Sequence, residues 1–208
     1  PLGSRANQAA AGTIHQALQA AGLEASLQPF ACPLWEERET RLELDGERLS
    51  AGANAFSPPF DVTAPTVAVG TLDELAAADL TARIGVLYGD LTKGTGWSAR
   101  SSVYYPEELQ RIVSLLEEKQ PAALVTVHSK IGSLERRIRD PEFRIPSVTA
   151  PAEAGLALLR RPGPTVRLRI DAHQTPSEFA NVVATTRGTG GGRILLLTHL
   201  DTVHESPG

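Results

Sequence analysis

The sequence predicts an α/β fold, because segments with the apolar spacing of helices alternate with short segments typical of strands. The clearest helix covers 106–119, where apolar residues recur every three or four positions and Pro106 stands in the first turn. The apolar segment 123–128 follows it and predicts a buried strand. In the same way, an amphipathic helix over 8–21, ended by Gly22, precedes an alternating strand pattern over 23–30.

The remaining segments continue this alternation of helical and extended patterns. We expect strands over 41–44, 48–51, 66–69, 84–88, 145–149, 166–170 and 179–185, and helices over 72–80, 135–139 and 152–160. Four consecutive large apolar residues over 194–197 predict a central strand covered on both faces. Arg136, Arg137 and Arg139 are expected on the solvated face of the short helix 135–139.

Composition narrows the class of protein. With 208 residues, of which 41% are hydrophobic and 21% charged, the chain can bury the core of one or two globular domains. A formal net charge of -4 gives no overall basic field, so nucleic acid is not expected as the main partner. The single cysteine, Cys32, excludes an internal disulfide, and no run approaches the roughly 20 apolar residues that cross a membrane.

Breaks rich in proline suggest how the domains are arranged. Such breaks lie at 57–59 and 162–164, and the stretch 50–163 between them is expected to be a self-contained insertion. Residues 5–49 and 164–208 would then form one interrupted domain. Residues 1–4 resemble the remnant of a cleaved expression tag, and the sequence contains no methionine. We therefore expect an internal piece of a longer protein, whose cellular compartment stays open.

The candidate site follows the apolar run 194–197, where His199 and Asp201 stand two residues apart. Functional groups of α/β sheets gather at the carboxyl ends of strands. An imidazole there can bind a metal ion, and a carboxylate two residues on can orient its ring. The alternative is a His-X-Asp that arises by chance, with His199 only hydrogen-bonded at a strand end. For His15, His128, His173 and His204, ordinary structural or surface roles are expected.

Three stretches resemble the co-catalytic zinc peptidases of metallopeptidase family 28, which include leucyl aminopeptidases, aminopeptidase Y and glutamate carboxypeptidase. They are Asn-Val-Val-Ala at 181–184, the segment 193–203 with its His-Leu-Asp-Thr-Val, and the closing Pro-Gly at 207–208. Residues 5–30 are similar to the family's first helix and strand. The resemblance implies an incomplete three-layer α/β/α peptidase domain, interrupted by an inserted mixed α/β protease-associated domain over 50–163.

The resemblance also implies a function and a site. His199 would bind one of two zinc ions, and Asp201 would be the catalytic carboxylate that orients this imidazole. The family's other ligands and its catalytic glutamate follow this motif, so the piece alone is expected to be inactive. The full-length enzyme would hydrolyse N-terminal peptide bonds with a zinc-activated water, and its partners would be a peptide substrate and the remainder of the catalytic domain. Substrate-binding residues stay unknown.

Other functional readings remain open. His-Leu-Asp-Thr-Val also resembles the first metal motif of family 20 metallopeptidases and deacylases, although the long insertion before His199 favours the aminopeptidase. A non-catalytic module that binds a peptide or protein through the protease-associated segment is a second alternative. A scaffold without chemistry would be favoured by a buried His199. For the insertion we expect a role as a lid over the substrate pocket.

Overall fold

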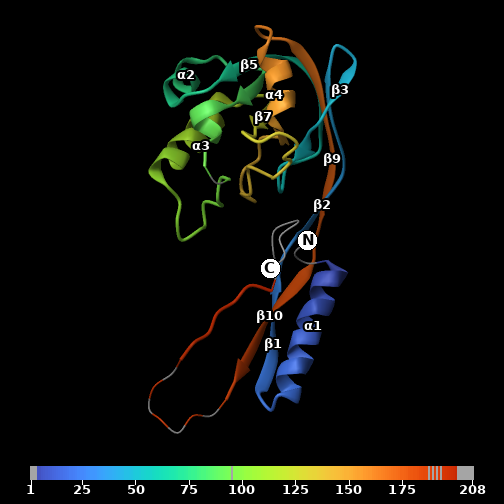
Figure 1. The fold of residues 1–208 in the computed structure, drawn as a ribbon, viewed down its shortest axis with the longest axis vertical. Helices are drawn as coiled ribbons and strands as arrows, with labels where there is room; N and C mark the ends of the chain where they lie inside the picture. The colour runs from blue at the N-terminus through green and yellow to red at the C-terminus, as the bar shows by residue number, and fades with distance from the viewer. Residues whose placement is uncertain are drawn as a thin grey trace. The chain divides into compact units, whose positions relative to one another are not determined.

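The computed structural model describes residues 4–94, 96–186, 188, 190, 192 and 194–200. The chain divides into two compact units (Figure 1). We call them the terminal unit, formed by the described residues of 1–36 and 174–208, and the central unit, formed by those of 37–173.

The terminal unit consists of one helix and a two-stranded antiparallel sheet. Helix α1 (Arg5–Ala20) begins at Ser4, whose side chain accepts a hydrogen bond from the backbone N–H of Asn7. Gly22, with φ +82°, turns the chain into β1 (Glu24–Ala31), which pairs along its whole length with β10 (Glu178–Thr185). Phe30 and Phe179 face each other across the pair, with ring centroids 5.5 Å apart in an edge-to-face arrangement.

Polar side chains connect α1 to both strands of the terminal unit. The Gln8 side-chain amide donates to the carbonyl of Glu178 in β10, and Nε2 of His15 lies 3.2 Å from the carbonyl of Ala25 in β1. Ala11 is the buried residue of α1. Because a two-stranded sheet is marginally stable by itself, the helix supplies the cover that it needs.

The central unit is built on one eight-stranded mixed sheet, in the order β3-β2-β9-β5-β6-β7-β8-β4. Four neighbouring strands, β5 to β8, run parallel, whereas β3, β9 and β4 pair antiparallel with β2, β5 and β8. The strand bounds are β2 Leu34–Leu44, β3 Glu47–Leu49, β4 Gly52–Ala53, β5 Phe60–Val69, β6 Ile84–Leu87, β7 Ala123–Val127, β8 Ser147–Ala150 and β9 Thr165–Thr175.

Helices cover both faces of the parallel strands. Successive side chains of a strand point to opposite faces, so Leu124 and Val127 of β7 lie on opposite faces of the sheet. Leu124 belongs to a buried cluster with the inner face of α3 (Glu107–Lys119) and with Leu75 of α2 (Leu72–Ala77). Val127 packs instead against α4 (Ala152–Leu159). The central unit is therefore a three-layer arrangement, in which α2 and α3 share one side (Figure 1).

A buried polar network joins the segment after β7 to the sheet. The side-chain oxygen of Asn54 accepts hydrogen bonds from the backbone N–H groups of Arg137 and Ile138 and from the hydroxyl of Thr149. Its amide nitrogen lies 3.4 Å from the hydroxyl of Thr126. Asn54, Thr126 and Thr149 are all fully buried, so their polar groups bond to one another and to the backbone in place of water.

The predicted α/β class is confirmed, but the helix expected over 135–139 is wrong. The backbone groups of this segment bond to distant partners: Ile138 forms a bridge with Trp97, and Asn54 takes two of the N–H groups. The expectation for its arginines is wrong in part as well. Arg137 is only 3% exposed, whereas Arg136 and Arg139 lie at the surface.

The buried strand expected over 194–197 is also not observed. These four residues form no strand, and they are between 78% and 93% exposed. A central strand is buried by the strands beside it and the helices above it, and within the described residues nothing pairs with this segment.

The compact central unit is longer than the insertion expected over 50–163. It begins at Glu37 and ends at His173, because most of β2 and β9 take part in the eight-stranded sheet. The eight-stranded sheet thus continues into the flanking segments 37–49 and 164–173.

Candidate functional site

The structure describes one of the two residues of the candidate metal motif. His199 is exposed and lies outside any helix or strand. The hydroxyl of Thr198 is 3.5 Å from its carbonyl oxygen. Asp201 and His204 lie outside the described residues. The exposure of His199 removes the observation that would have favoured a scaffold without chemistry.

The residues that zinc prefers do not gather elsewhere in the described chain. Over 4–94 and 96–200, apart from the single gaps near 190, no group of three or more His, Cys, Asp or Glu side chains could hold a metal ion. A zinc site requires at least three protein ligands. His199 fits zinc as a donor and is accessible, but the described residues by themselves do not complete a site.

His128 has the structural role expected of it. Its side chain, 3% exposed, ends β7, and Nδ1 accepts a hydrogen bond of 3.0 Å from the backbone N–H of Lys130. The proton must then be on Nε2, which lies 3.8 Å from the carboxylate of Glu135. Burial lowers the pKa of His128, and the nearby cation of Arg137 adds to this effect. A neutral imidazole thus caps the strand.

For His173 a structural or surface role was expected, and the structure places it in a strand. It lies within β9, near the carboxyl end of that strand, and is half-buried. The alternation of apolar and polar residues that begins at Val166 continues through Ala172, so the strand pattern itself extended further than expected.

Arg137 is a buried residue that sequence reasoning missed. Its guanidinium group donates to the carbonyl oxygens of Thr92, Lys93 and Gly94, which follow or end the short 3-10 helix η1 (Gly89–Thr92). Burial lowers its pKa. The group holds two loops together, and no local sequence pattern could reveal it because its acceptors are about 45 residues away, as for Thr92.

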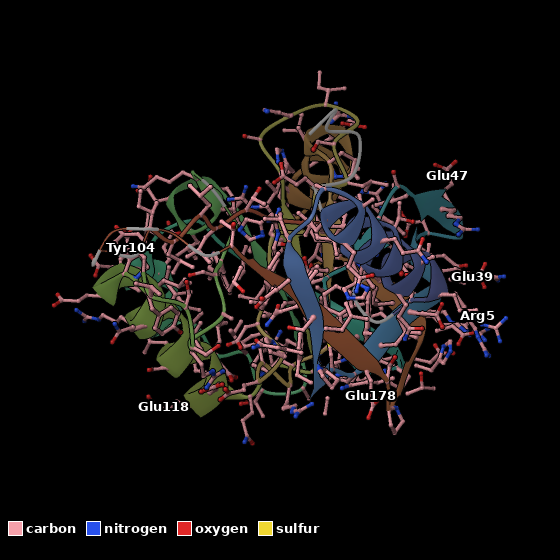
Figure 2. All side chains as sticks on the ribbon, turned by 90° about the horizontal axis from the view of Figure 1, so that it is seen from below. Arg5, Glu39, Glu47, Tyr104, Glu118 and Glu178 are labelled. Carbon is pink, nitrogen blue, oxygen red and sulfur yellow. The ribbon has the colours of Figure 1, made fainter. Side chains whose placement is uncertain are left out.

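The aromatic residues divide between the core and the surface. Trp35 and Trp97 are buried, and the indole N–H of Trp97 donates to the carbonyl of Leu91. Trp97 also meets Phe143 edge-to-face at 6.4 Å. Tyr104 instead projects into solvent near α3, as does Glu118 of that helix (Figure 2).

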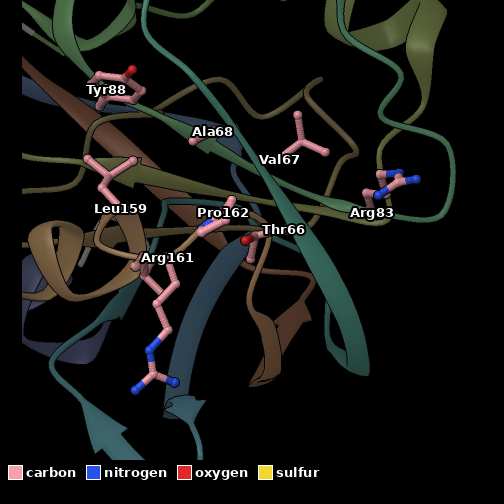
Figure 3. Close-up of a pocket in the computed structure, with 10 residues that line it drawn as sticks. Thr66, Val67, Ala68, Arg83, Tyr88, Leu159, Arg161 and Pro162 are labelled. Carbon is pink, nitrogen blue, oxygen red and sulfur yellow. The ribbon is translucent and has the colours of Figure 1, made fainter.

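A groove of about 660 Å³ lies beside β5 in the central unit (Figure 3). One wall is the strand itself at Thr66, Val67 and Ala68. The opposite wall is formed by the end of α4 and the turn after it, at Leu158, Leu159, Arg161, Pro162 and Gly163. Arg83, which directly precedes β6, and Tyr88, which directly follows it, complete the lining. A hollow of this size can take a segment of peptide or a small molecule.

No protein-family profile matches the chain. Over 220 aligned residues it is 24% identical to a protein of Aspergillus fumigatus named "Probable leucine aminopeptidase 2", and the match covers 100% of this chain and 40% of that protein.

Solved structures of aminopeptidases share the fold. The aminopeptidase from Aneurinibacillus sp. strain AM-1 matches with a TM-score of 0.68 and 22% identity, over 91% of this chain and 45% of that chain. A zinc aminopeptidase from Bacillus subtilis matches with a TM-score of 0.62 and 18% identity, over 90% and 43%. A peptidase M28 precursor from Shewanella amazonensis gives 0.62 and 18%, over 88% and 45%.

These matches define the class of fold to which the chain conforms, that of the M28-type zinc aminopeptidases. The chain spans less than half the length of each of these relatives. In the described parts of the chain, no helix combines the length and the apolar character needed to span a membrane.

Proposed function

We propose that this chain is part of a zinc-dependent exopeptidase that removes N-terminal residues from peptides. The observation that supports the proposal is the fold, which the chain shares over about nine tenths of its length with proteins described as aminopeptidases. The similarity to a leucine aminopeptidase along the whole chain points in the same direction.

In this proposal His199 supplies one zinc ligand and Asp201 orients its imidazole. The exposed imidazole of His199 is accessible to an ion, and a carboxylate partner is the usual means of fixing the ring of a metal-binding histidine. Bound zinc would lower the pKa of a water molecule and polarise the scissile carbonyl. The other ligands and the second ion would require residues besides those described. The piece of 208 residues alone is then inactive.

The proposal extends to the arrangement of domains. Residues 5–49 and 164–208 belong to the peptidase domain, and 50–163 form a protease-associated insertion that covers the substrate pocket. That the central unit forms a sheet and core of its own supports an insertion. Deletion of 50–163 from the full-length protein should relax its preference for peptide length, and an unchanged preference would contradict the role as a lid.

Zinc content and hydrolysis of aminoacyl-p-nitroanilides test the enzymatic proposal, measured on this piece and on the full-length protein. We expect zinc and activity only in the longer protein, and loss of activity with reduced zinc content in His199→Ala. His15→Gln is the matched control, because His15 contacts a backbone carbonyl of β1 and should leave zinc content unchanged. Asp201→Asn should weaken zinc binding by about 10- to 100-fold.

The same measurements distinguish the alternatives. A family 20-type enzyme would prefer N-acylated amino acids or C-terminal residues over aminoacyl-p-nitroanilides. A full-length protein that binds no zinc and hydrolyses neither class of substrate would be a non-catalytic binding module.

A further inference from the structure

The edge of β5 that faces the groove has no neighbouring strand beside the last residues of β5. β9 pairs with β5 from Phe60 to Pro65 and no further, since β9 begins opposite Pro65. One more hydrogen bond, 2.9 Å from the backbone N–H of Thr66 to the carbonyl of Pro164, continues this edge. Beyond Thr66, β5 is paired only with β6, on its other side.

The backbone of Ala68 points to this open edge. Alternate residues of a strand direct their N–H and C=O groups to opposite sides. The carbonyl of Val69 accepts from Tyr88, next to β6, so Val69 and Val67 bond towards β6. Thr66 and Ala68 bond in the other direction, and Ala68 is exposed within the groove. One donor and one acceptor of the main chain are thus presented to a further strand.

The sides of the groove suit an extended chain with apolar residues. Leu159 and Tyr88 are half-buried and face the groove (Figure 3). The Tyr88 ring lies over Gly70 so closely that a Cβ on Gly70 would be 2.9 Å from the ring atom Cε2. The ring can pack this closely because Gly70 has no side chain, and the contact holds the ring in place. The apolar wall therefore exists before any ligand binds.

The charges of the groove favour an acidic occupant. Its lining includes Arg83 and Arg161, which lie on different sides of Thr66 (Figure 3), and no acidic residue. Arg161 pairs with Asp45, but both side chains are more than half exposed, and such a surface pair is weak and exchangeable. Arg83 has no ion pair with any described residue, although Asp79 lies within range of its charge.

We propose that this groove binds an extended peptide segment with acidic side chains, which adds as a short strand to the open edge of β5. The peptide backbone pairs with Ala68, its apolar side chains contact Tyr88 and Leu159, and its carboxylates reach Arg83 or Arg161. Strand addition of this kind takes affinity from main-chain hydrogen bonds and selectivity from the side-chain contacts. The inference does not depend on the peptidase activity.

Isothermal titration calorimetry on the 208-residue chain tests the proposal with a short peptide of alternating valine and glutamate. The matching valine–lysine peptide is the control for charge, and an acidic peptide N-methylated on alternate backbone nitrogens is the control for strand pairing. We expect the acidic peptide to bind, both controls to bind at least about tenfold more weakly, and the amide signal of Ala68 to shift in a ¹H–¹⁵N spectrum.

Variants locate the site. Arg83→Gln and Arg161→Gln should each weaken binding about three- to tenfold, whereas Arg111→Gln, an exposed arginine on α3, should not change it. Ala68→Pro removes the outward N–H at an edge position where proline is tolerated, and should abolish binding while circular dichroism stays unchanged. Should that variant unfold, the N-methylated peptide supplies the same test.

Several results would overturn the proposal. The first is no measurable binding of the acidic peptide, and the second is equal binding of the valine–lysine peptide. Equal weakening by Arg111→Gln would reveal general attraction between charges, and full-strength binding of the N-methylated peptide would exclude strand addition.

Discussion

Val127 of β7 and Gly155 of α4 approach so closely that the interface leaves no room for a Cβ on the helix. A Cβ built on Gly155 would lie 2.2 Å from Cγ1 of Val127 and 2.8 Å from Cγ2. Both residues are buried, and Val127 is β-branched, so its side chain has little freedom to move aside. This contact sets the distance between α4 and the sheet, and α4 in turn forms one wall of the groove beside β5.

Gly155→Ala should therefore destabilise the protein, although alanine is the better helix former. We expect a loss of about 1–3 kcal/mol in the free energy of unfolding, measured by urea denaturation. Gly12→Ala is the matched control, since Gly12 lies in α1 with nothing within 4 Å of a built Cβ. That change should stabilise by up to about 1 kcal/mol. Partial recovery in the double variant with Val127→Ala would attribute the loss to this contact.

Asn54→Ala tests the buried polar network of the central unit. The substitution leaves the backbone N–H of Ile138 without its acceptor and leaves the backbone N–H of Arg137 with the Thr149 hydroxyl alone, in a site closed to water. An unpaired buried group costs about 1–3 kcal/mol, so we expect a loss of about 1–3 kcal/mol in unfolding free energy. Asn181→Ala, at an exposed position of β10, should change stability by less than about 0.5 kcal/mol. Similar effects of the two variants would contradict the importance of the network.

The elements that could be predicted from the sequence are those whose own residues show the pattern of a helix or a strand. The apolar residues of α3 recur at helical spacing, and all four that point inward, Leu109, Ile112, Val113 and Leu116, are buried. β7 is apolar along most of its length and is buried throughout. Such patterns are local, so one sequence is enough to read them.

Features that depend on distant partners could not be predicted. Asn54 and Arg137 are 83 residues apart in sequence, and neither shows its burial through its neighbours. The prediction for 194–197 was wrong for a related reason. Four large apolar residues indicated a buried strand, but burial also requires neighbouring strands, and none of the described strands pairs with this segment. For the candidate site, the motif around His199 supports a proposal of metal binding, but the further ligands that such a site needs cannot be read from a local pattern.

Arg137→Met should loosen the two loops that this guanidinium group joins. The carbonyl oxygens of Thr92, Lys93 and Gly94 would lose a shared donor, while the aliphatic part of the buried side chain is retained. We expect a loss of about 2–4 kcal/mol in unfolding free energy and faster amide hydrogen exchange around residue 94. Arg139→Met, at an exposed ion pair with Glu135, is the control and should cost less than about 1 kcal/mol. Equal exchange rates in both variants would show that the buried contacts do not hold the loop.

The last prediction concerns the dependence of stability on pH through His128. Its folded-state pKa lies below the ordinary 6.5, because burial and the cation of Arg137 disfavour the imidazolium; Lys130 adds to this, and Glu135 opposes it. As pH falls below about 6.5, the unfolded chain takes up a proton that the folded one refuses. The contribution of His128 to stability is therefore full above that pH and is lost progressively down to the folded-state pKa.

His128→Asn should remove this dependence, because the asparagine oxygen can still accept from the backbone N–H of Lys130 but has no proton to gain. Urea unfolding at several values from about pH 8 to about pH 5 should show the wild type losing stability relative to the variant below about pH 6.5. His15→Gln is the control for the loss of a histidine elsewhere in the chain. A constant difference between wild type and His128→Asn across this range would mean that His128 takes up its proton equally in the folded and unfolded chain.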